Sequence, residues 1–236
     1  MAAMLSLINA GDEAVIFEPF YENYGPDAIV SGARPRYVRM AWPDWSVDEE
    51  ELKAAFTDRT KVLILNTPNN PTGKVFSRDE LKVIADLCAD RDVVAVTDEI
   101  YEHIVFDGAR HVSLATIGDM ADRTITINGL SKTYSATGWR IGWAIAPRTL
   151  ANAMRRTHDF LTVGAPHPLQ IAATAALELP ESYYRDLAKM YQAKRDLFVR
   201  GLQEVGLDCG PPRGAYYVMA NFRRFPFADD WAFAMH

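Results

Sequence analysis

The sequence predicts an α/β protein with a doubly wound, mostly parallel sheet and helices on both faces of that sheet. Short apolar runs alternate with segments of helical periodicity as far as about Leu177, as strands alternate with crossover helices. The run 93–96 is apolar on both faces, which is typical of a parallel strand covered by helices. After Pro180 the pattern changes to one long helical stretch. We therefore divide the chain into a large unit, residues 1–179, and part of a smaller α+β unit, residues 180–236.

Strands are predicted where β-branched and apolar residues form short runs. These runs are 14–17, 62–65, 93–96, 124–127, 141–146 and 216–222. The segment 66–73, which follows the second run, contains prolines, asparagines and a glycine and cannot be regular structure.

Helices are predicted from periodicity and from their end signals. Residues 2–8 form an amphipathic helix with Gly11 as its C-terminal stop. Two capping boxes, Ser46 with Glu49 and Ser77 with Glu80, begin the next two helices. The first of these runs through Phe56, and the second carries apolar residues at helical spacing, namely Leu81, Ile84, Ala85 and Cys88. A long helix covers 183–205 before Gly206, and Asp229 or Asp230 caps a last helix that runs to His236.

Composition and charge exclude several classes of protein. The 236 residues are 49% hydrophobic, enough for a substantial core. The formal net charge of −6 offers no electrostatic footprint for nucleic acid or an anionic membrane. Cys88 and Cys209 lack the spacing of metal ligands and are predicted to be isolated buried thiols, so we predict no metal site. No run approaches the ~20 apolar residues that span a bilayer, and residues 1–10 lack the basic start of a signal peptide. We expect a cytoplasmic protein.

The stretch from Asn128 to Arg140 carries the strongest chemical signal in the chain. It follows the predicted strand 124–127, and Gly129 and Gly138 indicate tight backbone on either side of Lys132. A lysine in that place suits a Schiff base with an aldehyde cofactor, and Arg140 suits bidentate contact with the phosphate of that cofactor. The alternative for this stretch alone is a surface loop with two solvated cations.

The carboxyl ends of four predicted strands deliver side chains to one edge of the sheet, where doubly wound proteins bind ligands. In chain order these side chains are Tyr21, Tyr24, Asn70, Asp98, Tyr101, Lys132 and Arg140. Each has a plain structural explanation, such as turn formation for Asn70 and helix capping for Asp98. Together they supply an acid, a phenol, an amide, an aromatic face, a lysine and an arginine, which are the groups needed to hold pyridoxal 5′-phosphate.

Over essentially its whole length the chain resembles the class I (fold type I) pyridoxal-phosphate aminotransferases. The resemblance is carried by these motifs: Pro19-Phe20-Tyr21, Asn70-Pro71-Thr72-Gly73, Asp98-Glu99-Ile100-Tyr101, Ser131-Lys132 and Thr137-Gly138-Trp139-Arg140. It implies the fold type I large domain with part of the small C-terminal domain. It also implies transfer of an amino group from an amino acid to a 2-oxo acid by a ping-pong mechanism, in a homodimer.

The resemblance also assigns roles to the site residues. It implies that Lys132 forms the aldimine and acts as general acid and base, and that Asp98 pairs with the pyridine nitrogen. Tyr101 and Asn70 are expected to hydrogen-bond the ring phenolate oxygen, while Tyr21 stacks on the ring. By the same resemblance Arg140, with Ser131 beside it, binds the phosphate, and Tyr24 stands behind the aspartate.

The chain departs from the pattern of that family in three places. Position 129 is glycine where many relatives have a phosphate-binding hydroxyl, so Ser131 or backbone amides have to compensate. The glycine-rich phosphate loop and the dimer arm belong before residue 1, and the arginine that grips the substrate carboxylate belongs after residue 236. We therefore expect these residues to be a fragment, lacking both ends, that transaminates poorly or not at all.

The same sequence bears on other classes of function. Gly73-Lys74 prompts a phosphate-loop nucleotide binder, but Pro68 and Val75 occupy two of the positions that such a loop requires. A dinucleotide oxidoreductase needs a glycine fingerprint that no stretch supplies. A β-lyase or related elimination enzyme uses the same cofactor residues and stays open, as does a catalytically silent relative. The amino donor is not specified, although the aromatic loop at Phe20, Tyr21 and Tyr24 suggests room for a neutral or aromatic side chain.

Overall fold

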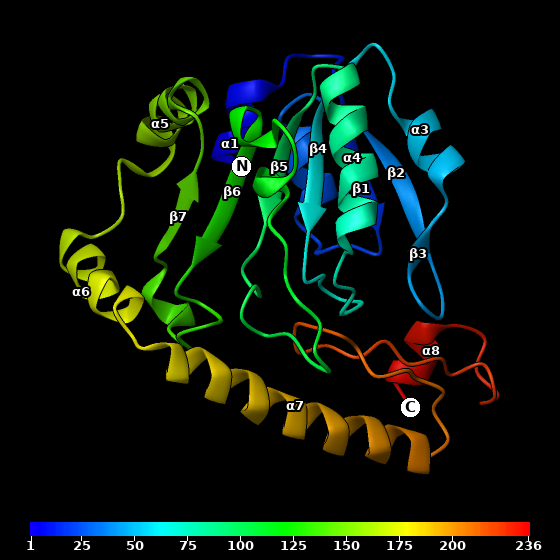
Figure 1. The fold of residues 1–236 in the computed structure, drawn as a ribbon. Helices are drawn as coiled ribbons and strands as arrows, with labels where there is room; N and C mark the ends of the chain where they lie inside the picture. Colours follow the sequence, from blue (N-terminus) through cyan, green and yellow to red (C-terminus); the bar gives the residue numbers. More distant parts are fainter.

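A central seven-stranded sheet organises the computed structural model, which describes residues 1–236 (Figure 1). The strands are β1 (Glu13–Glu18), β2 (Arg34–Ala41), β3 (Ser46–Val47), β4 (Thr60–Asn66), β5 (Val94–Asp98), β6 (Thr124–Gly129) and β7 (Gly142–Ile145). Their order is β3-β2-β1-β4-β5-β6-β7. The inner pairs from β2 to β6 are parallel, and the edge pairs β2/β3 and β6/β7 are antiparallel. The prediction of a doubly wound, mostly parallel α/β fold is confirmed.

Helices cover both faces of this sheet. They are α1 (Ala2–Leu7), α2 (Tyr24–Val30), α3 (Glu49–Ala55), α4 (Arg78–Asp90), α5 (Arg148–Thr162), α6 (His167–Leu177), α7 (Glu181–Glu204) and α8 (Asp230–Ala234). One hydrophobic core lies between the sheet and α3 and α4, and a second lies between the opposite face and α1, α2 and α5. None of the helices combines the length and the apolarity needed to cross a membrane.

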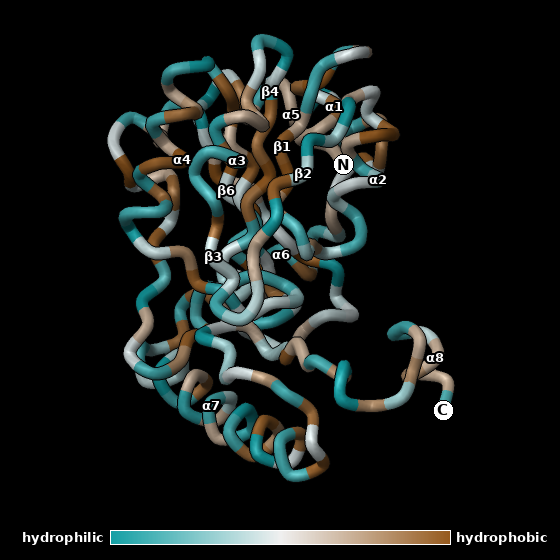
Figure 2. The backbone as a smooth tube through the Cα atoms, turned by 90° about the vertical axis from the view of Figure 1, so that its right-hand side faces the viewer, coloured by the Kyte–Doolittle hydropathy of each residue, from teal (hydrophilic) through white to brown (hydrophobic).

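The inner strands are apolar along their whole length because both of their faces are buried. In β4, Leu63 and Leu65 belong to the first core, while Val62 and Ile64 belong to the second. Figure 2, in which the backbone is coloured by the hydropathy of each residue, shows the hydrophobic residues concentrated in the strands at the centre. Burying apolar side chains on both faces stabilises the fold by about 25 cal/mol per Å² of apolar surface removed from water.

Several local predictions are confirmed. Ser77 and Glu80 form the complete capping box of α4, since the side chain of each bonds to the backbone N–H of the other. The four apolar residues predicted behind it are buried. Both cysteines are free and buried. The long helix is present as α7, and Asp229 caps α8 through a 2.7 Å hydrogen bond from the Ala232 N–H.

The first predicted capping box is wrong. Asp48 caps α3, because its Oδ1 accepts from the N–H groups of Glu50 at 2.8 Å and Glu51 at 2.9 Å. Ser46 instead lies in β3, opposite Ala41 of β2. The sequence spacing of a capping box was present, but pairing with Ala41 in the short β2/β3 hairpin decided the conformation of Ser46.

Other boundaries also differ from the prediction. Helix α1 ends at Leu7, and Gly11, with φ +91°, lies in a later turn rather than at the end of the helix. The segment 216–222 is not a strand, since only the isolated bridges at Gly214 and Asn221 pair nearby backbone. Helix α8 stops at Ala234. The prediction contained neither α2 nor β2, and two short 3₁₀ turns rather than a helix connect β5 to β6.

The last long helix lies across the end of the sheet where the site residues gather. Helix α7 crosses beneath the carboxyl ends of the parallel strands in Figure 1. Leu187 of α7 packs with Tyr101, Ile104, Phe106 and Ala215 in one hydrophobic cluster. The division of the chain at residues 179 and 180 stays a prediction, and it falls in the connection between α6 and α7.

Candidate active site

A cavity of about 320 Å³ opens at the carboxyl ends of β1, β4, β5 and β6, together with the segment around Tyr217. Its lining residues are Tyr21, Tyr24, Asn66, Asn70, Asp98, Ile100, Tyr101, Ile127, Ser131, Lys132, Thr137, Arg140 and Tyr217. The structure thus brings together every site residue predicted from the sequence: Tyr21, Asn70, Asp98, Tyr101, Ser131, Lys132 and Arg140. A volume near 300 Å³ is at the small end of the range for ligand pockets.

The parallel register explains why residues so far apart in sequence meet here. Asn66 at the end of β4 pairs with Asp98 at the end of β5, and Asp98 pairs with Ile127 of β6. Each strand therefore releases its loop at the same edge of the sheet. Asn66, which the sequence did not single out, joins two of these loops. Its Nδ2 donates to the Asp98 carbonyl at 2.9 Å, and its Oδ1 accepts from the Asn70 N–H at 2.6 Å.

The Asp98 carboxylate is held by two donors at the inner wall of the cavity. The Tyr24 hydroxyl donates to Oδ2 at 2.7 Å, and the Ile100 N–H donates to Oδ1 at 3.2 Å. Desolvation by the surrounding protein raises the pKa of Asp98, against the hydrogen bond from Tyr24, which lowers it. The predicted position of Tyr24 behind the aspartate is confirmed by this contact. A carboxylate in that environment favours a cationic partner.

Tyr101 lines the cavity, and its hydroxyl shares a 2.9 Å hydrogen bond with the Tyr217 hydroxyl. Desolvation, which is the largest cause, and this hydrogen bond raise the pKa of Tyr101 well above its ordinary value. Tyr101 therefore stays a neutral phenol that can donate to an anionic oxygen. Sequence reasoning missed Tyr217, because no local pattern connects it to a residue 116 positions earlier.

Lys132 and Arg140 are two cations at this cavity without carboxylate partners. Neither lies within ion-pair distance of an acidic group. The Lys132 Nζ instead lies 5.9 Å from the ring centroid of Tyr101 and 5.5 Å from that of Tyr216. An unpaired lysine beside aromatic rings is available to react with a carbonyl group.

The loop after Lys132 is folded tightly around Thr137. The Thr137 hydroxyl donates to the Ser131 carbonyl at 2.6 Å, and one guanidinium N–H of Arg140 donates to the Thr137 carbonyl at 3.0 Å. Arg140 has φ +54°, a left-handed conformation that costs a non-glycine residue about 1–2 kcal/mol. Such a conformation persists only where contacts with the surrounding structure hold the backbone in place. Here the strained residue is the one whose exposed guanidinium lies at the cavity.

Gly129 has a structural reason for lacking a side chain. A Cβ at this position would lie 2.8 Å from the Ile141 carbonyl oxygen and 3.0 Å from the Gly142 Cα. The antiparallel strands β6 and β7 approach too closely there for any larger residue. The absent hydroxyl at position 129 is therefore explained by the packing of β7.

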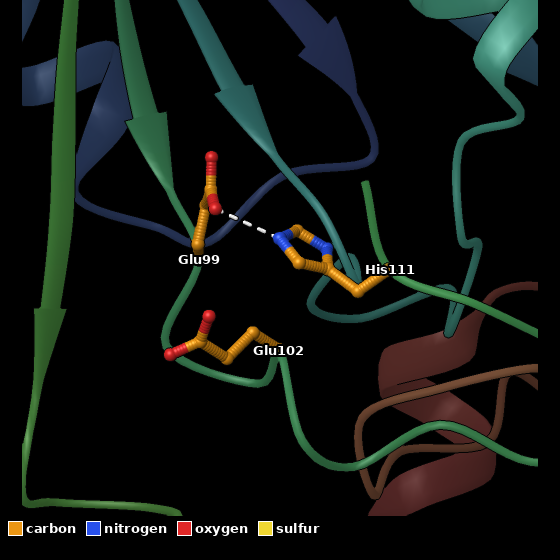
Figure 3. Close-up of side chains that lie close together, drawn as sticks. All are labelled: Glu99, Glu102 and His111. Carbon is orange, nitrogen blue, oxygen red and sulfur yellow. Dashed lines mark hydrogen bonds and ion pairs between the residues drawn. The ribbon is translucent and has the colours of Figure 1, made fainter. Parts of the chain in front are cut away.

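A second polar cluster lies directly behind the site, around Glu99. Figure 3 shows the His111 ring beside the buried Glu99 carboxylate, with Glu102 below them. The His111 Nε2 is 2.7 Å from Glu99 Oε2, and the hydroxyls of Ser113 and Thr97 donate to Oε1 at 2.8 and 3.0 Å. Both oxygens of the Glu99 carboxylate therefore have partners. Because Glu99 lies between Asp98 and Tyr101 in the chain, these contacts also hold the turn that carries those two site residues.

The side chains of the cavity fit pyridoxal phosphate. An acid that favours a cationic partner, a phenol that stays protonated, an unpaired lysine and an unpaired arginine line one small volume. These match a pyridine nitrogen, a phenolate oxygen, an aldehyde and a phosphate respectively. Tyr21 offers an aromatic face at the rim, with its ring edge-on to Tyr24. The individual roles stay predictions.

Comparison with known proteins places the chain among enzymes of one kind. A sequence model described as "Aminotransferase class I and II" matches residues 1–233. The kynurenine–oxoglutarate transaminase of Dictyostelium discoideum is 40% identical over 239 residues, which cover 93% of this chain and 55% of that protein. Human kynurenine–oxoglutarate transaminase 1 is 39% identical, with 94% and 57% covered. The chain thus spans about half the length of the curated relatives it matches.

Solved structures agree with that result. The N-succinyldiaminopimelate aminotransferase from Mycobacterium tuberculosis superposes with a TM-score of 0.96 at 38% identity, covering 99% of this chain and 62% of that one. YbdL from Escherichia coli, for which a methionine aminotransferase function has been identified, superposes with a TM-score of 0.93 at 31% identity, covering 98% and 61%.

Proposed function

Since the chain belongs to the class I and II aminotransferase family, we propose that it carries the cofactor-binding part of an enzyme that transfers an amino group from an amino acid to a 2-oxo acid. The observation that carries this proposal is the convergence of Lys132, Asp98 and Arg140 in one cavity. The family is one of pyridoxal-phosphate enzymes, and the cavity fits that cofactor.

Each side chain has a distinct task in this proposal. When bound, pyridoxal phosphate supplies an electron sink that stabilises negative charge on the substrate α-carbon. Asp98 holds a proton on the ring nitrogen, because an opposite charge nearby favours the protonated form. Tyr101 and Asn70 donate hydrogen bonds to the ring oxygen, while Tyr21 covers one face of the ring. Arg140 binds the phosphate, with Ser131 beside it.

Lys132 has the second task of moving protons. With pyridoxal phosphate and substrate bound, the Lys132 amine would be the base that accepts the proton from the substrate α-carbon. A base that is positioned in this way contributes roughly 10²–10⁴-fold to such a step. The rings of Tyr101 and Tyr216 lie beside this amine, with their centroids 5.9 and 5.5 Å from Nζ.

The names of the relatives support an aromatic amino donor and oxoglutarate as acceptor. Kynurenine, the donor in those names, is an aromatic amino acid, and the rim of this cavity carries the aromatic side chain of Tyr21. Elimination by a β-lyase is less well supported, since these relatives are named transaminases. We further propose a cytoplasmic homodimer without a nucleic-acid or membrane partner, in line with the net charge of −6.

An assay of amino-group transfer tests the proposal directly. With pyridoxal phosphate, kynurenine and 2-oxoglutarate, any glutamate that the purified protein forms, even slowly, is expected to require both substrates. Lys132→Ala is the control, because it removes the amine and leaves the other cavity residues in place. Release of pyruvate and ammonia from a β-substituted alanine without any 2-oxo acid would favour elimination instead. Gel filtration tests the dimer.

A further inference from the structure

The first turn of α7 is bonded to the turn that carries Lys132. The Tyr183 hydroxyl donates to the Thr133 carbonyl at 2.7 Å, one residue after the lysine. The Tyr184 hydroxyl shares a 2.8 Å hydrogen bond with the Tyr134 hydroxyl. The rings of Tyr134 and Tyr183 also lie 6.0 Å apart and 6° from parallel. Two adjacent tyrosines of α7 thus contact two adjacent residues of the lysine turn.

The lysine turn comprises residues 130–137, which include Lys132, and it has few hydrogen bonds of its own. Within residues 130–137, the Ser135 N–H donates to the Lys132 carbonyl and the Ala136 N–H to the Leu130 carbonyl, both at 3.2 Å, and the Thr137 hydroxyl donates to the Ser131 carbonyl at 2.6 Å. Ser135 has φ +54°, so the backbone there is strained as well. The short bond from Tyr183 supplies a donor to the Thr133 carbonyl, which has no other partner. The hydrogen bonds from α7 therefore fix this turn at two further points, Thr133 and Tyr134.

Helix α7 also reaches the other surroundings of the lysine. The Tyr184 ring lies 4.2 Å from the ring of His103, two residues after Tyr101. Farther along the helix, the Tyr191 ring stacks on Tyr216 at 5.5 Å, and Tyr216 is one of the two rings beside the Lys132 Nζ. The helix thus contacts both the backbone that carries Lys132 and an aromatic ring beside its amine.

We propose that Tyr183 and Tyr184 are positioning residues, which act on Lys132 through the backbone of residues 132–134. Their hydroxyl groups fix the turn relative to α7, and the turn sets where the lysine amine stands in the cavity. The inference rests on the proposed function, because it concerns the lysine that would bond to pyridoxal phosphate. Misplacement of a reacting group by about 1 Å can lower a rate by roughly 10²-fold, so a hydroxyl outside the cavity can matter to the chemistry.

The substitutions Tyr183→Phe and Tyr184→Phe test this proposal, since each removes one hydroxyl and keeps the ring. The matched control is Tyr191→Phe on the same helix, because the Tyr191 hydroxyl makes no hydrogen bond while its ring stacks on Tyr216. The first measurement is hydrogen exchange at the amides of Ser135 and Ala136 without cofactor. We expect exchange about fivefold faster in the two test variants, as for loss of one hydrogen bond, and unchanged in the control.

The second measurement is the pH midpoint of the visible absorbance of protein-bound pyridoxal phosphate. That midpoint depends on where the Lys132 nitrogen stands relative to the cofactor, and a general loss of stability would not move it. We expect a shift of about half a pH unit in Tyr183→Phe and Tyr184→Phe, and none in Tyr191→Phe. Equal exchange and equal midpoints in all three variants would overturn the inference. A failure of the proposed function looks different: the unsubstituted protein would then not bond pyridoxal phosphate at Lys132.

Discussion

Asp98→Asn separates the electronic task of Asp98 from simple cofactor binding. The amide has nearly the same shape as the carboxylate, and both present contacts can be kept. Its oxygen can accept from the Ile100 N–H, while its NH₂ group can donate to the Tyr24 hydroxyl. The change therefore removes the charge and leaves the geometry of the cavity wall. We expect the cofactor still to bind, because Arg140 and the other cavity residues are unchanged.

The expected loss of rate follows from the loss of that charge. Removing one partner of a buried ion pair costs about 3–5 kcal/mol. Here the remaining partner is the protonated ring nitrogen, whose charge is needed most when the substrate α-carbon loses its proton. The half-reaction with an amino acid should therefore slow by roughly 10²- to 10⁴-fold per bound cofactor. Single-turnover absorbance changes measure this rate, and fluorescence titration measures the dissociation constant of the cofactor.

The cofactor-free protein gives a second readout of the same substitution. The folded-state pKa of Asp98 lies above its value in the unfolded chain, because the charged form is desolvated in the cavity. Ionisation of Asp98 therefore costs stability, and that loss develops as the pH rises from about 3.9 up to the raised folded-state pKa. Asn does not titrate. The melting temperature of Asp98→Asn minus that of the unsubstituted protein should increase across this interval and then level off.

Tyr24→Phe serves as the intermediate control for Asp98→Asn. It keeps the carboxylate and removes one donor to it, so the pKa of Asp98 should rise further and the rate should fall much less than in Asp98→Asn. The reasoning would be refuted if Asp98→Asn lost the cofactor as fully as Arg140→Ala and kept an unchanged rate per bound cofactor.

Three other predictions concern single positions. Borohydride reduction and peptide mapping should place a pyridoxyl group on Lys132, and an adduct on Lys74 would contradict the assignment. Arg140→Ala should weaken cofactor binding roughly 10- to 100-fold in a fluorescence titration, as expected for loss of charge-assisted hydrogen bonds to a phosphate, and an unchanged affinity would exclude that role. Gly129→Ala should destabilise the fold by about 1–3 kcal/mol and lower its melting temperature by several degrees, because the added Cβ meets backbone at 2.8 Å. Gly138→Ala, whose Cβ would meet nothing within 4 Å, is the control, and equal melting temperatures would contradict the packing argument.

The features that sequence predicted well depend on neighbours along the chain. The capping box of Ser77 and Glu80 lies within one turn of helix, so a short spacing was enough to identify it. The site residues were also predictable, because each lies at the carboxyl end of a buried strand or in the loop that follows it. The parallel arrangement of those strands then forces their carboxyl ends to one edge of the sheet. The cavity that contains all of these residues is a consequence of topology.

Ser46 has the spacing of a cap, but its backbone pairs with Ala41 in the short β2/β3 hairpin. The site features that sequence missed depend on contacts between distant segments. Tyr217 lies in a segment whose composition favours a strand, and its hydroxyl instead meets Tyr101 across 116 residues. Asn66 looks like any turn-forming residue until the register of β4 and β5 places it against Asp98. Such contacts are decided by how loops are brought together in space, and no local pattern records them.

The raised pKa of Asp98 links the stability of the protein to its cofactor. A desolvated carboxylate that has no ion-pair partner costs folding free energy; the neighbouring Glu99 carboxylate adds repulsion, and the Lys132 cation offsets the cost only in part. The structure tolerates this cost, since Tyr24 and the Ile100 N–H hold the carboxylate in place before any partner arrives. A protonated pyridine nitrogen would remove much of the cost on binding, so part of the binding free energy comes from relief of a destabilised charge. It follows that the cofactor should raise the melting temperature of the unsubstituted protein more than that of Asp98→Asn, even at equal occupancy.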